Sequence, residues 1–334
     1  MVTIPLCSQA ICLYEQWLKI LSDLGRARAT VIAYRTALHH FFGFCSQKGL
    51  LPEQATFEDI AAYIRPQLPG MPYPAASATL QLRLSAIRLW FDYLIYTDVI
   101  SRNPLPRSGL PGMSASGRAL VPRIITLPKI PEDSRWQHFL NYVSERSLRD
   151  RLMLALAYCG ALRRAEVTAI AVEDIDPAHR LIRIRAENTK NKCERIVCYG
   201  PDITPVLAAH LRSLRVSGIT GGALFRSVSD RNYGSPLSYW SWSKTVRDWA
   251  DKAELPELTT HTFRHLRLTH LARAGWKLHE IATYAGHRDL RTTQIYIHLS
   301  GSELAARMAL TVADIDRKVA GIMFSREKLN EKQV

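Results

Sequence analysis

The sequence predicts a mainly α-helical protein of two domains, with one small β-hairpin in the second domain. Three observations predict this fold class. Apolar residues recur at helical spacing through most of the chain, whereas apolar and basic residues alternate at 180–185 as they do in a strand. A segment rich in Pro and Gly, residues 103–131, separates two groups of expected helices. A length of 334 residues also suits two domains.

Residues 1–102 are expected to form a bundle of four or five helices, because no strand alternation occurs there. Gly25 and Gly49 each follow an apolar stripe and are expected to end its helix, and Thr30 is the expected cap of the second helix. Thr56 and Asp59 resemble a capping box at the start of a short third helix. The longer helices are expected at residues 8–24, 30–48 and 77–97.

The expected linker, residues 103–131, carries charge of one sign. Its prolines exclude a continuous helix. No acidic residue lies between Asp98 and Glu132, whereas that stretch contains Arg102, Arg107, Arg118, Arg123 and Lys129. A linker needs polarity but does not need a single sign of charge. The pattern therefore favours a strap that lies along the phosphates of a nucleic acid; a merely soluble basic linker is the alternative.

Residues 132–300 are expected to form the second domain, helical around the β-hairpin. Residues 180–185 and 195–199 are the expected strands, and the polar, basic segment 187–194 is the hairpin tip. Apolar stripes predict the helices of this domain at residues 133–146, 148–161, 164–171, 203–216, 238–253, 260–274, 277–285 and 290–299.

The charge of the chain indicates a polyanionic partner. Lys and Arg number 44 against 30 Asp and Glu, a formal net charge of +14, which favours nucleic acid over a membrane surface. No apolar run of about 18 residues occurs, so no bilayer span is expected. The N-terminus lacks the features of a secretory signal. The six cysteines form no CxxC pair and are expected to be free thiols in the cytoplasm.

Five short segments carry residue types that suit phosphoryl chemistry. On the expected helix 260–274, His261, Arg264 and His265 share one face because they are three and four residues apart. The two histidines could suggest a metal pair, but no HExxH segment and no carboxylate at ligand spacing accompany them, so zinc is not expected. Each remaining segment is a weak signal alone. These segments contain Arg163 at a helix start, Lys190 at the hairpin tip, an expected exposed His287 after the helix stop Gly286, and Tyr296.

Together the segments resemble the signature of the tyrosine site-specific recombinases, the phage integrase family that includes Cre and the Xer resolvases. In chain order they read CGALRRAEV, NTKNKCERIV, HTFRH, YAGHRD and TTQIYIH. The steps of 23 residues from Arg264 to His287 and nine from His287 to Tyr296 match the compact members of the family. The catalytic resemblance covers about residues 130–300. Residues 1–102 resemble the family's helical core-binding, SAM-like domain in helix pattern and position.

The chain departs from the family pattern without losing a catalytic group. Ala161 stands where Gly is usual, and Ala285 stands where Leu is usual. Arg164 adds a second basic residue beside Arg163 and leaves open which of them reaches the phosphate. The register of the surrounding box favours Arg163.

The resemblance implies how the phosphate is bound. Arg163 and Arg264 would bind the non-bridging oxygens and hold the charge that develops in the transition state. His287 would donate a hydrogen bond to a phosphate oxygen, and Glu166 would orient neighbouring side chains. Arginine and lysine supply the positive charge, so the resemblance implies no metal, no cofactor and no ATP.

The resemblance also implies the proton transfers. Tyr296 would be the nucleophile, and because a phenol is protonated at neutral pH it needs a proton acceptor. His261 would be that acid/base group, and Lys190 would be the general acid for the departing 5′ oxygen. Lys192 is the alternative to Lys190 and is otherwise expected to contact DNA.

The function implied is that of a site-specific DNA recombinase working through a 3′-phosphotyrosyl intermediate and a Holliday junction, for integration, excision, transposition or replicon resolution. The alternatives are a type IB topoisomerase-like relaxing enzyme and a catalytically degenerate DNA-binding accessory protein. The partners implied are double-stranded DNA with specific core sites and a homotetramer with a dimer on each site. A second recombinase or accessory protein is a further candidate. The expected location is the bacterial cytoplasm, at the nucleoid.

Residues 301–334 form a tail that extends beyond the nucleophile. An apolar stripe runs along it at Leu304, Met308, Val312, Ile315, Val319 and Ile322. Such a stripe must pack on something. Packing on its own domain is one possibility, and the resemblance favours docking on a neighbouring subunit.

Overall fold

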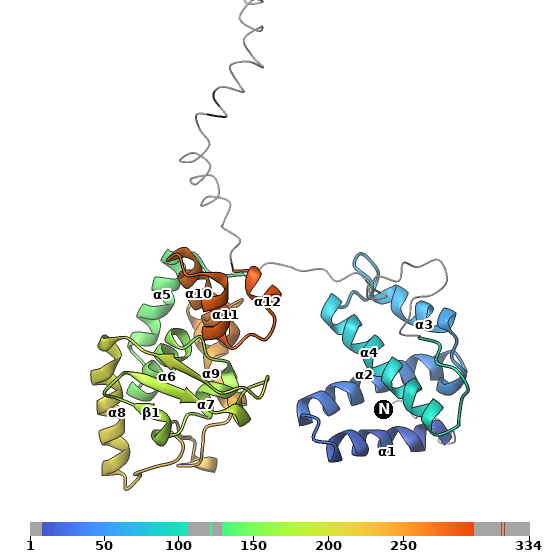
Figure 1. The fold of residues 1–334 in the computed structure, drawn as a ribbon, viewed down its shortest axis with the longest axis horizontal. Coiled ribbons are helices and arrows are strands. Elements are labelled where there is room, and N and C mark those ends of the chain that lie inside the picture. Colours follow the sequence, from blue (N-terminus) through green and yellow to red (C-terminus); the bar gives the residue numbers. More distant parts are fainter. Residues whose placement is uncertain (1–8, 106–120, 122–128, 297–314, 316, 318–334) are drawn as a thin grey trace, which may run out of the picture. The chain divides into compact units, whose positions relative to one another are not determined.

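The computed structural model describes residues 9–105, 121, 129–296, 315 and 317 (Figure 1). The chain divides into two compact units, Met1–Thr126 and Leu127–Val334, and each has a hydrophobic core of its own. Both units are mainly helical, and a small antiparallel sheet lies in the second, which confirms the predicted fold class. Within the described ranges, no helix is long and apolar enough to cross a membrane.

The first unit is a helical bundle with an aromatic core. The ring centroids of Phe42 and Trp90 lie 5.0 Å apart in an edge-to-face arrangement, and both side chains are buried. Edge-to-face contacts of this kind stabilise a core beyond the area that they bury. The two rings come from the two long helices of the unit, which pack against each other. The described helices are α1 (Gln9–Asp23), α2 (Arg28–Gln47), α3 (Phe57–Ile64) and α4 (Ser77–Tyr96).

Most helix boundaries of this unit follow local sequence signals. Thr56 and Asp59 form the predicted capping box of α3, with the Thr56 hydroxyl accepting from the Asp59 backbone N–H at 3.2 Å. Gly25 and Gly49 follow α1 and α2 with φ angles of 76° and 64°. Glycine adopts this left-handed conformation at little cost, so both positions end their helices as predicted.

The cap predicted at Thr30 is wrong. The helix α2 already begins at Arg28, and Ala27 occupies the N-cap position without a side-chain hydrogen bond. The backbone N–H of Thr30 bonds to the carbonyl of Ala27 at 2.8 Å. Thr30 therefore lies inside the first turn, where its hydroxyl is not needed to satisfy that donor.

The packing of the first unit continues into the segment predicted as the linker. Leu105 and Val121 are buried in the core of this unit. Their carbonyls also accept hydrogen bonds from α4, from Arg88 at 3.1 Å and from Gln81 at 2.5 Å respectively. The structure thus places these two positions with the helical bundle, because their apolar side chains find a core there.

The second unit contains the remaining described helices and all three described strands. The helices are α5 (Asp133–Ser144), α6 (Leu148–Cys159), α7 (Arg164–Thr168), α8 (Thr204–Val216), α9 (Tyr239–Lys252), α10 (Thr260–Arg273), α11 (Leu278–Ala285) and α12 (Arg291–Gln294). The strands are β1 (Ile175–Asp176), β2 (Leu181–Ile184) and β3 (Arg195–Cys198).

Most of the predicted elements of this unit are reproduced, and α7 is shorter than predicted. It ends at Thr168 because the chain beyond it bonds elsewhere: the carbonyl of Ile170 accepts from Leu224, and the N–H of Val172 donates to Gly222. At the other end of the unit, α12 ends at Gln294, and the predicted helix residues after 296 lie outside the described part.

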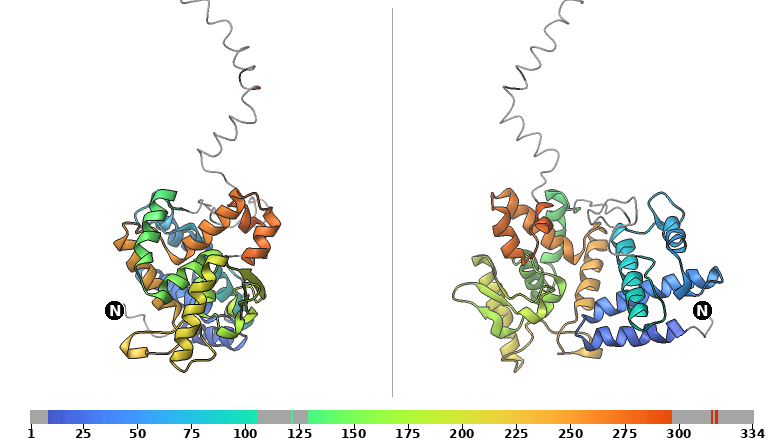
Figure 2. Two further views of the ribbon diagram at one scale, coloured as in Figure 1. Left: turned by 90° about the vertical axis from the view of Figure 1, so that its left-hand side faces the viewer. Right: turned by 45° about the vertical axis from the view of Figure 1, so that its right-hand side comes forward.

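The sheet has the order β1-β2-β3 and is antiparallel throughout. Ile182 pairs with Ile175 on one side and with Val197 on the other. Ile182, Ile184 and Val197 are buried in the core of the unit, whereas Ile196 on the opposite face is 59% exposed. The helices thus cover one face of the sheet (Figures 1 and 2), and β1 was missed because two residues give no alternation signal.

The helix α10 runs between two hydrophobic clusters. Phe263 and Leu266 belong to the main core of the unit, whereas Leu268 and Leu271 belong to a smaller cluster that also contains Tyr296. The helix packs against α6 and α11. Side chains of α10 that point between the clusters are therefore fixed by packing on both sides, as a preorganised site requires.

Candidate active site

Glu166 lies at the centre of a buried ion-pair network that joins α7 to β3. Its side chain is 1% exposed and lies 2.8 Å from Arg163 and 2.7 Å from Arg195. It also accepts the backbone N–H of Arg163 at 2.9 Å, which caps α7. Burial raises the pKa of Glu166, but the hydrogen bonds and charges of Arg195 and Arg163 outweigh burial and hold it below its usual value. Glu166 is therefore an ionised anchor for both guanidinium groups.

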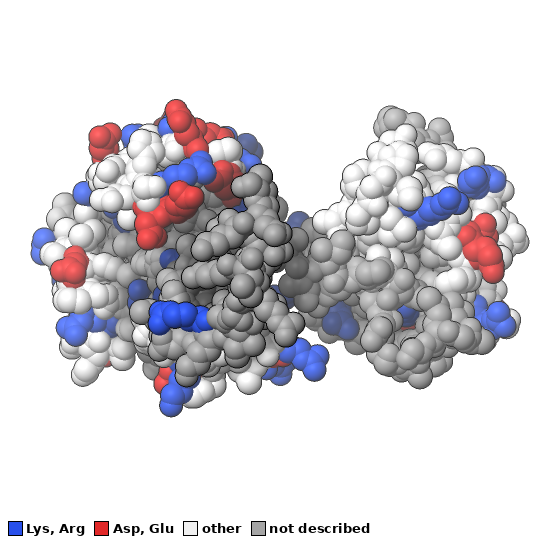
Figure 3. Space-filling model, turned by 90° about the horizontal axis from the view of Figure 1, so that it is seen from above, with Lys and Arg blue, Asp and Glu red and all other residues white. Residues whose placement is uncertain are grey.

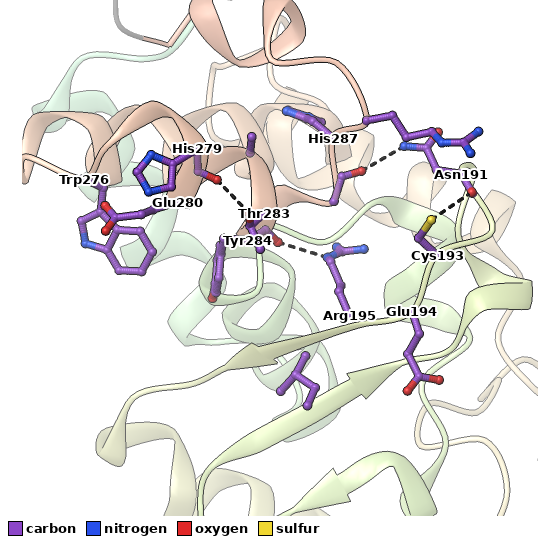
Figure 4. A pocket seen from close by; sticks show the side chains of 14 residues that line it. Asn191, Cys193, Glu194, Arg195, Trp276, His279, Glu280, Thr283, Tyr284 and His287 are labelled. Carbon is purple, nitrogen blue, oxygen red and sulfur yellow. Dashed lines mark hydrogen bonds between the residues drawn. The ribbon is translucent and has the colours of Figure 1, made fainter.

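Arg195 ties the hairpin to the turn that carries His287 (Figure 4). Its side chain is 7% exposed, and its Nε donates to the carbonyl of Tyr284 at 3.1 Å. Asn191 at the hairpin tip donates to the carbonyl of Gly286 at 3.0 Å. A groove of about 740 Å³ lies between the hairpin and α11 and is lined by these residues. The hairpin tip is thus anchored at two points to the segment that precedes His287.

The hairpin tip presents its two lysines differently. Lys192 donates from Nζ to the carbonyl of Glu187 at 3.2 Å, so its ammonium is held by the backbone of the tip itself. Its φ angle is 54°, in the left-handed region. Lys190 is exposed beside Asn191, whose side chain makes the anchor to the segment before His287.

Arg264 is buried at the meeting point of three elements. The residue is 1% exposed. Its guanidinium donates to the carbonyls of Ala161 and Ala285, both at 2.6 Å, and to Nε2 of His287 at 2.8 Å. Burial, followed by the charge of Arg163, lowers the pKa of Arg264 from its ordinary value, but the group stays charged at neutral pH. The carbonyls fix the fork in one orientation.

His287 is half-buried, so the expectation of an exposed imidazole is wrong. A guanidinium can only donate, and therefore Nε2 of His287 accepts from Arg264. The proton is assigned to Nδ1, which donates to the hydroxyl of Thr293 at 2.7 Å. Burial and the charge of Arg264 lower the pKa of His287 to about 3. Both ring nitrogens are thus engaged by protein.

Tyr296 points into this cluster from the end of α12. It is 4% exposed, and its ring stacks on that of His287 with an interplanar angle of 9° and centroids 6.3 Å apart. Its hydroxyl lies 2.8 Å from Nδ1 of His265. Burial raises the pKa of Tyr296, which the charges of Arg264 and Arg163 oppose. The hydroxyl therefore carries its proton at neutral pH, and it donates that proton to Nδ1 of His265 when the imidazole is in the tautomer protonated at Nε2.

His261 lies one turn before His265 on α10. The two imidazoles meet edge to face, with centroids 4.4 Å apart. His261 is exposed as a residue, yet surrounding atoms desolvate its ring and, with the charge of Arg264, hold its pKa below the usual value. The acid/base residue implied by resemblance thus adjoins His265, which contacts the hydroxyl of Tyr296.

Comparison with known proteins decides the family. The profile described as the phage integrase family matches residues 132–303, more than half of the chain. The chain belongs to the phage integrase family. A second profile, the N-terminal SAM-like domain of phage integrases, matches residues 14–97. The protein is therefore a tyrosine site-specific recombinase, an enzyme that transfers DNA strands, and the alternative functions are not favoured.

Curated relatives and solved structures agree with this family. The tyrosine recombinase XerD of Shewanella oneidensis is 28% identical over 292 residues, which cover 85% of this chain and 90% of that protein. The tyrosine recombinase XerC of Roseiflexus castenholzii is 28% identical over 295 residues, covering 86% and 88%. The structure of XerH bound to palindromic difH after cleavage matches with a TM-score of 0.66 at 18% identity, covering 89% and 84% of the two chains. The last comparison shows a common fold.

The structure explains why the integrase pattern usually has Gly at the position of Ala161. This residue adopts a φ angle of 47°, which an L-residue other than Gly occupies at a cost of roughly 1 kcal/mol. The turn that requires this conformation presents the carbonyl of Ala161 to Arg264. The extra arginine, Arg164, is directed elsewhere: it stacks over Tyr239 and Trp240 on α9, 5.0 and 4.9 Å from their ring centroids.

The residues predicted to contact DNA lie mostly outside the described ranges. Arg102 is described and exposed. Arg107, Arg118 and Arg123 lie outside the described residues. In the part of the chain that the structure describes, no group of three His, Cys, Asp or Glu side chains is gathered for a metal ion.

Arg195 and Thr293 were missed as site residues by sequence reasoning. A signal for Arg195 is present in β3: Arg195, Val197 and Tyr199 alternate onto one face, and Val197 and Tyr199 are buried. A basic residue in register with two core residues indicates a charge that points inward and needs a buried partner. Thr293 is 0% exposed, and the sequence offers no comparable signal for its role beside His287.

Proposed function

We propose that Tyr296 is the nucleophile of a strand-transfer site in which Arg163 and Arg264 bind the scissile phosphate. The observation that carries the proposal is the position of the Tyr296 hydroxyl. It lies inside the cluster of Arg264, His287 and His265, where its ring and hydroxyl contact two of these side chains. A tyrosine exposed on the protein surface would lack these contacts with His287 and His265.

The electrostatics of the cluster suit attack on a phosphodiester. The phosphate gains negative charge as the phenolic oxygen approaches phosphorus, and preorganised guanidinium groups stabilise that charge. Arg264 is fixed by two carbonyls and Arg163 by Glu166. The side chain of Arg163 is 22% exposed, so it remains accessible to a ligand while its orientation is set from behind.

The proposed reaction transfers one phosphoryl bond at a time. The Tyr296 oxygen forms a bond to the 3′ phosphate while the bond from phosphorus to the 5′ oxygen breaks. Lys190 supplies the proton for that oxygen, and Lys192 is the weaker candidate because its ammonium is held by Glu187. A 5′ hydroxyl of a second duplex reverses the step, so two exchanges produce a Holliday junction without ATP.

The DNA-free geometry indicates that His287 must change partners. Its Nε2 accepts from Arg264, and its Nδ1 donates to Thr293. A hydrogen bond from His287 to a phosphate oxygen requires a proton on the nitrogen that faces the phosphate. We infer that the bound phosphate draws the guanidinium of Arg264 away from Nε2 of His287. The negative charge of the phosphate then favours protonation of the His287 ring.

Strand exchange in EDTA tests the function. Substrates would come from the DNA beside the gene, where inverted repeats are expected. Because arginine and lysine hold the charge, we expect covalent protein–DNA adducts and four-stranded junctions in excess EDTA without nucleotide. A strict Mg²⁺ requirement for cleavage would contradict the mechanism, and relaxation of supercoils without junctions would favour a topoisomerase-like activity.

We propose double-stranded DNA with specific core sites as the substrate, and a homotetramer with a dimer on each site as the assembly. The net charge of +14 supports a polyanionic partner. Basic side chains mix with acidic ones on the face of the second unit that Figure 3 shows, so that face is not a uniform basic surface. The proposed location is the bacterial cytoplasm, at the nucleoid. Integration, excision, transposition and resolution all use this chemistry, with or without a second recombinase or accessory protein.

We propose that the chain is organised in four segments, residues 1–102, 103–131, 132–300 and 301–334. The tail would dock on a neighbouring subunit. The apolar stripe of the tail, of which Ile315 is a member, needs a surface to pack on. Packing of the tail on its own domain is the alternative.

Separation of the two units tests whether both grip DNA. Each unit has its own core, so residues 127–334 can be compared with the whole chain. Tethering makes the second contact intramolecular, and we expect the isolated second unit to bind core-site DNA at least ~100-fold more weakly. Its affinity should also depend less steeply on salt, because fewer phosphates are contacted. Equal affinity of the two proteins in a titration would exclude the clamp.

A further inference from the structure

The hydroxyl of Tyr296 meets a histidine that the family resemblance does not assign. Nδ1 of His265 lies 2.8 Å from the Tyr296 oxygen, and the two rings are tilted by 39° with centroids 5.5 Å apart. The ring of His261 contacts the ring of His265, with 4.4 Å between the two centroids. Any proton that leaves the phenol along its existing hydrogen bond therefore reaches His265 first.

We propose that His265, in place of His261, is the proton acceptor for Tyr296 in strand cleavage; this proposal rests on the proposed function. As the Tyr296 oxygen bonds to phosphorus, its proton passes to Nδ1 of His265, and the bond to the 5′ oxygen breaks with a proton from Lys190. In rejoining, the 5′ hydroxyl gives its proton to Lys190 as its oxygen attacks phosphorus, and Nδ1 of His265 returns its proton to the departing Tyr296 oxygen. Both directions balance without metal or oxidant.

The surroundings of His265 suit this role. A histidine can accept a proton only when the accepting nitrogen is unprotonated. Burial, the neighbouring His261 and the charge of Arg264 lower the pKa of His265 to about 4, so the ring is neutral at neutral pH. Nδ1 then accepts in the tautomer that carries its proton on Nε2. A bound phosphodiester brings a negative charge that offsets Arg264 and raises the basicity of the ring. The site thus has an acceptor that strengthens when substrate arrives.

The chain offers a matched control on the same helix. His270 also forms a hydrogen bond with a tyrosine, with 2.6 Å between its Nδ1 and the hydroxyl oxygen of Tyr158. Its pKa is likewise lowered by burial, and it is half-buried like His265. Neither His270 nor Tyr158 belongs to the proposed catalytic set. Substitution of His270 therefore reports the general cost of breaking a Tyr–His contact on α10.

Asparagine separates proton transfer from positioning. The side-chain oxygen of Asn can occupy the place of Nδ1 and accept the hydrogen bond, but it is not a base. With full-length protein and a nicked duplex core site, we expect His265→Asn to slow single-turnover cleavage by about 100-fold or more with DNA affinity unchanged. We expect His270→Asn to cleave within about threefold of the wild type. When sulfur replaces the 5′ oxygen of the substrate, the leaving group departs without protonation by an acid. Cleavage of this substrate should therefore no longer depend on Lys190 but should still depend on His265.

Rescue by a free base completes the test. His265→Ala leaves space at the hydroxyl, and added imidazole should restore cleavage by at least tenfold, increasing with the fraction of neutral imidazole. Cleavage by His265→Asn at the rate of His270→Asn, or failure of imidazole to rescue His265→Ala, would overturn the proposal. If the wild-type protein forms no adduct at all, the proposed function fails instead, so the two failures are distinguishable.

Discussion

Replacing Tyr296 with Phe is expected to abolish covalent adduct formation while DNA binding stays within about twofold of the wild type. The substitution removes only the phenolic oxygen, which is the proposed nucleophile. The ring of Phe can keep the stacking on His287, whose centroid lies 6.3 Å away. A nicked suicide substrate, in which the released fragment diffuses away and prevents rejoining, would measure the adduct.

The stability of this variant provides an internal check. Loss of the hydrogen bond to His265 should cost about 0.5–1.5 kcal/mol, which lowers Tm by about 1–6 °C in a domain of this size. Tyr284→Phe is the control, because its hydroxyl bonds to the carbonyl of Cys159 at 2.6 Å and lies in no proposed catalytic role. Normal adduct formation by Tyr296→Phe, or its loss in Tyr284→Phe alone, would exclude Tyr296 as the nucleophile.

Glu166→Ala is expected to destabilise the second unit by about 3–5 kcal/mol, because it leaves buried guanidinium charge without a partner. Arg195 is 7% exposed and has Glu166 as its carboxylate partner at 2.7 Å. The control is Glu194→Ala on the same hairpin. Its partner Arg183, 2.8 Å away, is 59% exposed, so loss of that solvent-exposed pair should leave Tm nearly unchanged. Thermal unfolding of the full chain would compare the two; equal shifts would contradict a structural role for the buried network.

Glu166→Gln predicts a distinct dependence on pH. The pKa of Glu166 lies below its usual value in the folded protein. The carboxylate of Glu166 therefore binds a proton more readily in the unfolded chain than in the folded protein. The stability that this group contributes is fully present above the ordinary carboxyl pKa and is lost as the pH falls through the lowered folded value. Stability of the Gln variant should therefore fall less steeply in acid than that of the wild type. Parallel acid denaturation curves would show that Glu166 does not carry this linkage.

Local sequence patterns predicted most of the helices and the hairpin. The boundaries of α8, α9 and α10 follow apolar periodicity, and the α3 capping box follows from two side chains three residues apart. These features are local, since each depends on contacts within a few residues of the chain. For the same reason β1 and the early start of α2, which depend on a partner strand and on backbone bonding, were not predicted.

The sequence by itself pointed to Arg163, Arg264, His287 and Tyr296, because their types and spacing are those of one family, but it did not assign a role to Arg195, Thr293 or His265. Only the tertiary structure decided their partners. Arg195 reaches Glu166 across 29 positions, Arg264 reaches Ala161 across 103, and Tyr296 meets His265 rather than His261. Contacts at such separations depend on how α7, β3, α10 and α12 pack together. The periodicity of one segment does not reveal these partners, because each contact joins elements that lie far apart in the chain and meet only when it folds.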